Sequence, residues 1–389
     1  MFLNTAVWIK VMLAILIAFV VSFALTPVVK ILAQKVGAMD VPGEARRVHD
    51  HPIPRMGGLA IFFGFILSAL IFVPLSTPVR GMLLGGVIIV ILGIFDDIYA
   101  LPALPKFFVQ IASALIAVLM GNQIDILSNP NIFSSEPYWV LGIWSIPISV
   151  LWIVGITNAV NLIDGLDGLA CGVSTISSMT MLVIALTVAE PDTALLMAAL
   201  AGACIGFLPY NLNPAKIFMG DTGSTFLGFI LATVSIDGLF KSYAIISFAV
   251  PFLMLGLPIF DTCFAIFRRV SHGQSPMAPD RGHIHHRLID MGFSQKQAVA
   301  VLYIISAILG LSAVVLTTTN VLKAMLFLLA LCAAGGVSAK LYLDRLNGRN
   351  QSDSPSQGRT GARPRKLHQP PSDVAGNDYF FGEEERSDK

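Results

Sequence analysis

Residues 8–29 read WIKVMLAILIAFVVSFALTPVV, a run in which Lys10 is the single charged residue. A helix needs about 20 apolar residues to cross the ~30 Å hydrocarbon core of a bilayer, so this run predicts a membrane-spanning helix. The run is longer than the apolar part of a signal peptide, and no small-residue cleavage pattern follows it. We therefore expect a helix that the mature protein retains.

Apolar runs of this kind recur along the chain. Of its 389 residues, 55% are hydrophobic and only 13% are charged, and the mean hydropathy is +0.76. Soluble domains carry about 25% charged residues, so this composition excludes one. The net charge of +1 gives no indication of nucleic-acid binding. We predict an all-α polytopic membrane protein with about eleven transmembrane helices, near 8–29, 57–75, 80–95, 105–120, 139–158, 168–188, 193–208, 222–236, 242–262, 298–317 and 320–342.

The loops between these helices differ sharply in charge. With alternating helices, 21 of the 25 lysines and arginines fall on one side of the membrane. Because positive loops stay in the cytoplasm, the N-terminus is expected outside and the C-terminus inside. We expect a membrane domain over 1–346 and a disordered cytoplasmic tail over 347–389, which is rich in Ser, Pro, Gly, Arg and Asp. The turn-rich outside loop 121–138 predicts a hairpin or a surface helix.

Groups that carry chemistry gather on the predicted cytoplasmic side. They are Asp96, Asp97, Asn158, Asn161, Asp164, Asp167, Asp221, His283, His285 and His286. The outside loops contain no histidine. Carboxylates and imidazoles on one membrane face favour metal-assisted chemistry on a substrate that is partly lipid.

Each segment also has a simpler structural interpretation. Asp96 and Asp97 are suited to a metal ligand beside a base, or to a solvated helix end. In NAVNLIDGLDGLA (158–170), Asn158, Asn161 and Asp164 recur every third residue. They are suited to a nucleobase, a ribose or a metal, or to a polar loop. The spacing does not match a calcium-binding loop.

The remaining segments leave similar alternatives. Asp221 in FMGDTGS (218–224) is suited to a helix N-cap, a phosphate site or a metal ligand. RGHIHHRL (281–288) lacks the spacing of a structural zinc site. Its two arginines are suited to pyrophosphate or to anionic lipid. The same two interpretations hold for Arg46, Arg47, Arg55 and His49. Asp261, at the expected end of the ninth helix, is placed near Arg268 and Arg269 as a pairing partner.

Together these segments resemble a known family. Asp96-Asp97, NAVNLIDGLDGLA, FMGDTGS, PIFDTCFAIFRR (258–269) and RGHIHHRL, in this order, are similar to the polyprenyl-phosphate N-acetylhexosamine-1-phosphate transferases. HIHHR resembles the branch that transfers N-acetylglucosamine phosphate more than the muramoyl-pentapeptide branch. The family's acidic motif often has a third polar position, where this chain has Ala100.

The resemblance implies a reaction. UDP-N-acetylglucosamine would give its sugar 1-phosphate to undecaprenyl phosphate at the cytoplasmic face of the inner membrane, releasing UMP. This would be the first membrane step of a cell-envelope polymer such as teichoic acid or O-antigen. UDP-N-acetylmuramoyl-pentapeptide is the alternative donor. A secondary transporter of a phosphorylated solute is the rival class, but its acids are expected near the bilayer midplane and not at helix ends.

The resemblance also implies a transferase domain over 1–346 with these site residues and partners. Asp96, Asp97, His283, His285 and His286 are expected to be catalytic; Asn158, Asn161, Asp164, Asp167, Arg46, Arg281 and Arg287 to bind substrate; and Asp221 and Asp97 to bind metal. The expected ion is Mg²⁺, with Mn²⁺ as the alternative. The expected partners are the UDP-sugar, the polyprenyl phosphate, membrane lipid and a second copy of the chain, but no nucleic acid.

Overall fold

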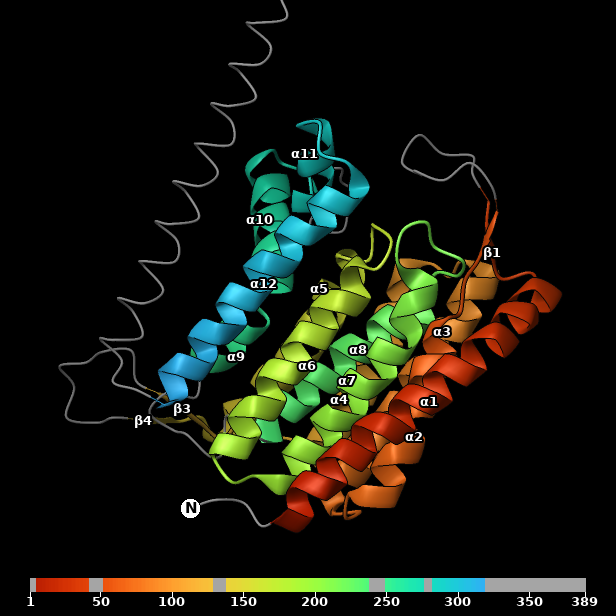
Figure 1. Ribbon diagram of the computed structural model, residues 1–389. Coiled ribbons are helices and arrows are strands. Elements are labelled where there is room, and N and C mark those ends of the chain that lie inside the picture. Colours follow the sequence, from red (N-terminus) through yellow and green to blue (C-terminus); the bar gives the residue numbers. More distant parts are fainter. Residues whose placement is uncertain (1–4, 42–51, 129–137, 238–248, 276–281, 319–389) are drawn as a thin grey trace, which may run out of the picture. The chain divides into compact units, whose positions relative to one another are not determined.

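The computed structural model describes residues 5–41, 52–128, 138–237, 249–275 and 282–318, which are mostly helical (Figure 1). The helices are α1 (Thr5–Val36), α2 (Gly58–Phe72), α3 (Thr77–Tyr99), α4 (Ala103–Leu119), α5 (Ser145–Leu162), α6 (Leu169–Thr187), α7 (Pro191–Asn211), α8 (Gly220–Ser235), α9 (Ala249–Met254), α10 (Gly256–Ser271), α11 (Ile284–Asp290) and α12 (Gln295–Thr318), with a 3-10 turn at Gly142–Trp144. The described residues also form two antiparallel pairs of short strands: β1 (Met39–Asp40) with β2 (Ile53–Pro54), and β3 (Ile126–Ser128) with β4 (Tyr138–Val140). Arg46, Arg281, the expected helix 320–342 and the tail 347–389 lie outside the described residues.

Six helical segments of the described chain are long and apolar enough to cross a membrane. They are Thr5–Val36, Thr77–Tyr99, Gly142–Leu162, Leu169–Thr187, Pro191–Asn211 and Gln295–Thr317. Helices α2 and α4 are apolar but shorter. The expectation of an all-α polytopic membrane protein is confirmed, while the helix count of eleven and the orientation stay predictions.

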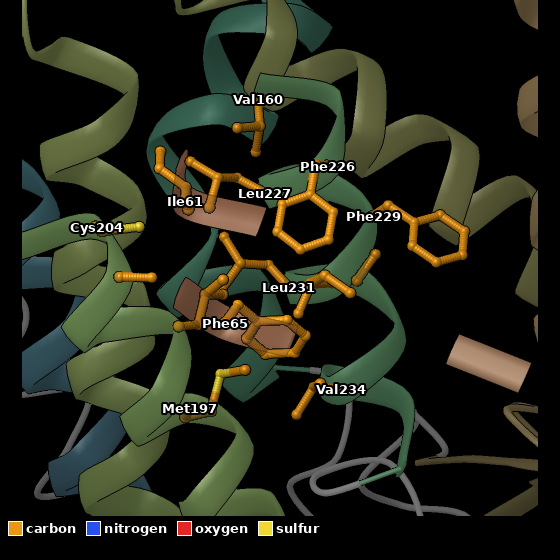
Figure 2. Packing of buried hydrophobic residues seen from close by; sticks show 14 of the residues in the cluster. Ile61, Phe65, Val160, Met197, Cys204, Phe226, Leu227, Phe229, Leu231 and Val234 are labelled. Carbon is orange, nitrogen blue, oxygen red and sulfur yellow. The ribbon is translucent and has the colours of Figure 1, made fainter. Parts of the chain in front are cut away.

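Helix α8 is the centre of the packing. Its segment TFLGFILATVS (225–235) is apolar on most sides, and every residue from Thr222 to Ser235 is buried. A helix that is apolar all round is stable only in an apolar interior. Helices α2, α3, α5 and α6 pack against it. Figure 2 shows side chains of α2, α5 and α7 gathered around it, among them Phe65, which meets Phe226 edge to face with ring centroids 5.6 Å apart.

The expected ninth helix, 242–262, is wrong in its boundaries. The described part of it is divided between α9 and α10, with a break at Leu255. Pro258 explains the break, because proline lacks a backbone N–H and its ring clashes with the carbonyl four residues earlier. Helix α10 then continues to Ser271, so Asp261 lies inside a helix instead of at its end.

The two ends of the helices carry different structures. In Figure 1, β1 and α11 lie toward the upper ends of the helices, and β3 and β4 lie toward the lower ends. The end of α3, the end of α5 and the beginning of α8 meet at one end of the helices, because residues of these segments are hydrogen-bonded to one another. The hairpin expected within 121–138 is confirmed at the lower end by the pairing of Ile126 with Val140, and 129–137 lie outside the described residues.

Candidate active site

Asp97 joins the end of α3 to the beginning of α8. Its Oδ1 accepts a hydrogen bond from the backbone N–H of Asp221 (2.9 Å), and its Oδ2 accepts from the N–H (3.1 Å) and hydroxyl (2.6 Å) of Thr222. The first N–H groups of a helix have no partner within the helix, so a carboxylate from a neighbouring helix caps them well. Asp97 therefore fixes the position of Asp221 relative to α3.

Asp96 and Asp221 meet at one cation. The Nζ of Lys106 lies 2.7 Å from Asp96 Oδ2 and 3.3 Å from Asp221 Oδ2. The other oxygen of Asp96 accepts from the backbone N–H of Leu101 at 2.7 Å. We call Asp96, Asp97, Lys106 and Asp221 the carboxylate cluster. Two carboxylates from different helices thus converge on a single positive group at the end of the bundle.

Lys106 is not among the site residues that the sequence predicts. The short connection between α3 and α4 indicates that Lys106 lies near Asp96, because α3 ends at Tyr99 and α4 begins at Ala103. A lysine in the first turn of α4 is therefore close to an acid in the last turn of α3. Its side chain is partly buried at 28% exposure, which strengthens the attraction to the acids.

Asn158 and Asn161 lie on α5, as their spacing predicts, but only Asn161 reaches the carboxylate cluster. Asn161 Nδ2 donates to Ser224 Oγ at 2.8 Å, and its side chain also interacts electrostatically with Asp221. Asn158 Nδ2 donates to Gln110 Oε1 at 2.7 Å and so joins α5 to α4. The two asparagines therefore have different surroundings despite sharing a motif.

Asp164 lies in the turn after α5, because that helix ends at Leu162. Burial and the charge of Asp221 raise the pKa of Asp164 to about 7, although Arg55 acts in the opposite direction. A carboxyl with such a pKa carries a proton part of the time near neutral pH. Asp164 is thus electrostatically part of the surroundings of Asp221.

Asp167 secures the chain that leads into α8. Its Oδ2 accepts hydrogen bonds from Asn213 Nδ2 (2.9 Å) and from the backbone N–H of Ala215 (3.0 Å). Asn213 also donates to Gln295 at the start of α12 (2.6 Å). These contacts give Asp167 a structural role in the described residues, and its expected contact with substrate stays a prediction.

The histidines begin α11, and we call residues 283–287 the histidine segment. His283 Nδ1 lies 2.8 Å from Asp261 Oδ2, and the backbone N–H of Ile284 donates to Asp261 Oδ1 at 2.8 Å. His283 is 5% exposed and His285 is 3% exposed. Asp261, which the sequence analysis had placed beside Arg268 and Arg269, therefore positions this segment. Its separation of more than 20 residues from His283 gave no sequence signal for the contact.

His285 connects the histidine segment to the turn that carries Asp164. Its ring lies so close to Gly165 that a Cβ at that position would overlap Nε2. Burial, with the neighbouring His286, lowers the pKa of His285 to about 3. His285 is therefore neutral at physiological pH, so its ring can donate or accept a hydrogen bond but carries no charge there.

Of the three arginines expected to bind substrate, the structure describes Arg287. Arg287 is exposed, and its guanidinium lies over the ring of Phe264, 5.0 Å from the centroid. Arg46 and Arg281 lie outside the described residues. The described part of the chain contains no group of three or more His, Cys, Asp or Glu side chains placed to hold a metal ion. Any ion would need further oxygens from substrate or water.

The chain is similar to known proteins over most of its length. Residues 79–239 match the family described as "Glycosyl transferase family 4". The "Probable undecaprenyl-phosphate N-acetylglucosaminyl 1-phosphate transferase" of Bacillus subtilis (strain 168) is 46% identical over 315 residues, covering 80% of this chain and 87% of that protein.

Two further relatives show the breadth of the match. The "Decaprenyl-phosphate N-acetylglucosaminephosphotransferase" of Mycolicibacterium smegmatis is 35% identical, covering 77% of this chain and 80% of that protein. The "Phospho-N-acetylmuramoyl-pentapeptide-transferase" of Staphylococcus aureus (strain JH9) is 32% identical, covering 76% and 96%. The matched region includes the carboxylate cluster, and the chain belongs to the polyprenyl-phosphate N-acetylhexosamine-1-phosphate transferase family.

Proposed function

We propose that this protein transfers N-acetylglucosamine 1-phosphate from UDP-N-acetylglucosamine to undecaprenyl phosphate. The observation that carries the proposal is the 46% identity, over 80% of the chain, to a relative with that name. Relatives named for the muramoyl-pentapeptide donor are less similar, at 32%. The product would be a lipid-linked pyrophosphoryl sugar that begins a cell-envelope polymer.

The carboxylate cluster fits Mg²⁺ by its donor chemistry. Asp96 Oδ2 and Asp221 Oδ2 already face one cation, Lys106. Mg²⁺ usually takes one or two carboxylates and completes its shell with phosphate oxygens and water. Asp97 stays a predicted ligand, but its oxygens are engaged with Thr222 and the N–H of Asp221. A bound ion would neutralise phosphate charge during transfer.

The chain's own residues would align two anions. An oxygen of the lipid phosphate attacks the phosphorus that bears the sugar, and the bond from that phosphorus to the bridging oxygen breaks. UMP then leaves with the bridging oxygen. Such transfer needs charge neutralisation and alignment more than covalent help. Lys106 would offset phosphate charge beside Asp96, which orients it, and neutral His285 would contribute hydrogen bonds.

The orientation belongs to the same proposal. The asymmetry of lysine and arginine supports eleven helices, an outside N-terminus and a carboxylate cluster that faces the cytoplasm of a bacterial inner membrane. Ser76 and Ser271 are exposed at opposite ends of their helices. In a cysteine-free background, Ser271→Cys should react with an impermeant reagent only from the cytoplasmic side, and Ser76→Cys only from outside. Labelling of both from one side would contradict the orientation.

The reaction is tested with purified protein in lipid nanodiscs. Undecaprenyl phosphate is supplied with UDP-N-acetylglucosamine or UDP-N-acetylmuramoyl-pentapeptide, and UMP and the lipid product are measured. We expect product with the first donor, loss of activity in EDTA, and recovery with Mg²⁺ or Mn²⁺. Product only with the second donor would move the chain to the other branch. A phosphorylated enzyme trapped with labelled donor in the absence of lipid would contradict direct attack.

A further inference from the structure

The segment around Arg55 is built onto the start of α8. The N–H of Phe218 donates to the carbonyl of Pro54 (2.8 Å), and the N–H groups of Gly57 and Gly58 donate to the carbonyls of Phe218 and Met219 (both 2.9 Å). Residues 54–58 thus run beside the chain that enters α8. Gly58 touches Gly223 so closely that a Cβ at Gly58 would overlap the backbone of α8. This backbone contact holds Arg55 at the edge of the carboxylate cluster.

The guanidinium of Arg55 lies among acids and forms one long ion pair, with Asp97, but no hydrogen bond within the described chain. Its Nε is 3.7 Å from Asp97 Oδ1, too far for a hydrogen bond, and its charge also interacts with Asp221, Asp40 and Asp164. Asp97 is already engaged by the first N–H groups of α8. Among the described residues, none accepts a hydrogen bond from this side chain, which is 32% exposed. Five N–H donors are therefore available at the edge of the site.

The geometry points to a ligand, and the location favours the nucleotide. Arginine presents a planar pair of donors that matches phosphate oxygens, and it is a common choice where phosphate is recognised in two-pronged fashion. Arg55 lies in the short segment between β2 and α2, outside the apolar helices, whereas Lys106 lies on the apolar helix α4. A water-soluble donor would approach from the side of Arg55, and the phosphate of a lipid from the side of the apolar helices.

We infer that Arg55 binds the nucleotide phosphate of the donor, the one that leaves as UMP. The inference rests on the proposed function. Arg55 would pair with this phosphate in the substrate and with the charge that develops on the leaving oxygen. The same contact would hold UMP after transfer and contribute to product inhibition. Arg55 therefore distinguishes a nucleotide from a nucleoside, because uridine lacks the phosphate.

Binding measured without turnover tests this independently of the reaction. Calorimetry of the full chain in nanodiscs with Mg²⁺ compares UMP with uridine for wild type, Arg55→Gln and Arg55→Lys. Hydrogen bonds to charged groups contribute enough that Arg55→Gln should weaken UMP binding about 10- to 100-fold. Uridine binding should change less than about twofold. Arg55→Lys keeps a charge beside Asp97 but loses the planar pair of N–H donors. It should weaken UMP binding at least about threefold.

Kinetics separate the two phosphate sources. With Arg55→Gln, the KM for UDP-N-acetylglucosamine should rise and that for undecaprenyl phosphate should not. Arg80→Gln removes an exposed arginine at the opposite end of α3 and should match wild type. Three outcomes would each overturn the inference. Arg55→Gln could raise only the KM for undecaprenyl phosphate, it could weaken the binding of uridine and UMP equally, or Arg55→Lys could bind UMP as tightly as wild type. Wild-type protein that binds UMP through Arg55 but makes no lipid product would contradict the proposed function alone.

Discussion

The carboxylate cluster and the histidine segment lie on neighbouring elements but are held in place in different ways. The cluster is attached to α8, whose residues from Thr222 to Ser235 are buried, and Asp97 makes three hydrogen bonds to the start of that helix. The histidine segment begins a helix of 7 residues, α11, and its described anchors are Asp261 and the close contact with Gly165. One region is fixed by many contacts of the core, and the other by a few.

This difference predicts where substitutions outside the site should change the reaction rate. Many closely packed side chains around α8 together hold the cluster in place. Helix α11 packs on α12, but the side-chain bond to His283 among the described residues comes from one carboxylate, that of Asp261. Substitutions in the cluster should therefore act on the chemistry or on stability, and substitution of Asp261 should act on the rate through geometry.

The largest effect is expected for Asp221→Asn. The amide keeps the size of the side chain but removes the charge that faces Lys106. An ion held by this carboxylate would supply several kcal/mol of transition-state stabilisation, so turnover should fall about 10³-fold or more. Addition of Mg²⁺ should not restore it in the nanodisc assay. Asp290→Asn, which changes an exposed acid at the end of α11, is the control. Near-normal turnover of Asp221→Asn would remove this residue as a ligand.

Asp261→Ala tests the weaker anchoring of the histidine segment. Loss of both hydrogen bonds should let His283 and the start of α11 shift, and small misplacements can reduce rates about 10- to 100-fold. We expect the loss in kcat, with a smaller loss for Asp261→Asn, which keeps one oxygen to accept from Ile284. Equal losses for both variants, or a change in melting temperature with kcat unaltered, would show that Asp261 supports the fold and not the histidines.

Asp97→Ala tests the cap on α8 by stability. The substitution leaves the N–H groups of Asp221 and Thr222 and one hydroxyl without their acceptor in a buried place. Unsatisfied buried groups should lower the free energy of unfolding by about 1–3 kcal/mol. Thermal unfolding in EDTA and without substrate separates this loss of stability from any effect on metal binding. Asp97→Asn should lower the free energy of unfolding by less than Asp97→Ala. An unchanged melting temperature would mean that water replaces the cap.

Local patterns in the sequence predicted much of the carboxylate cluster. Asp96, Asp97 and Asp221 were expected at one end of the membrane domain because apolar runs fix where helices end. The structure brings these three together with Asn161 and Asp164, as the shared side required. Periodicity and run length are local properties, so this much follows from the sequence of each segment.

Other contacts depend on tertiary packing and left no local signal. The bond between Asp261 and His283 joins residues from α10 and the N-cap of α11, and the ninth helix had been drawn through the break at Leu255. The continuous apolar run there concealed the effect of Pro258. Likewise, the place of Arg55 depends on backbone pairing between residues 54–58 and 218–219, which no periodicity reports. The resemblance to a family supplied function, but not these positions.

The smallest expected effect concerns pH and separates the two regions once more. Because burial lowers the pKa of His285 to about 3, its folded form stays neutral at pH values where the unfolded chain, with a pKa near 6.5, takes up a proton. The unfolded state then binds more protons, so stability is full above about pH 6.5 and is lost as the pH falls toward 3.

Between pH 7.5 and 5.5 this single group should reduce the free energy of unfolding by about 1 kcal/mol. The free energy of unfolding is measured by denaturation in EDTA at both pH values for wild type and for His285→Gln. The change with pH in the variant is subtracted from that in wild type, so the contributions of the carboxyl groups common to both proteins cancel. His272→Gln alters an exposed histidine at the end of α10 and is the matched control. If His285→Gln and wild type lose stability in parallel, the pKa of His285 in the fold equals the unfolded value near 6.5. Its proposed role as a neutral hydrogen-bonding group beside Gly165 would then be limited to pH values above about 6.5.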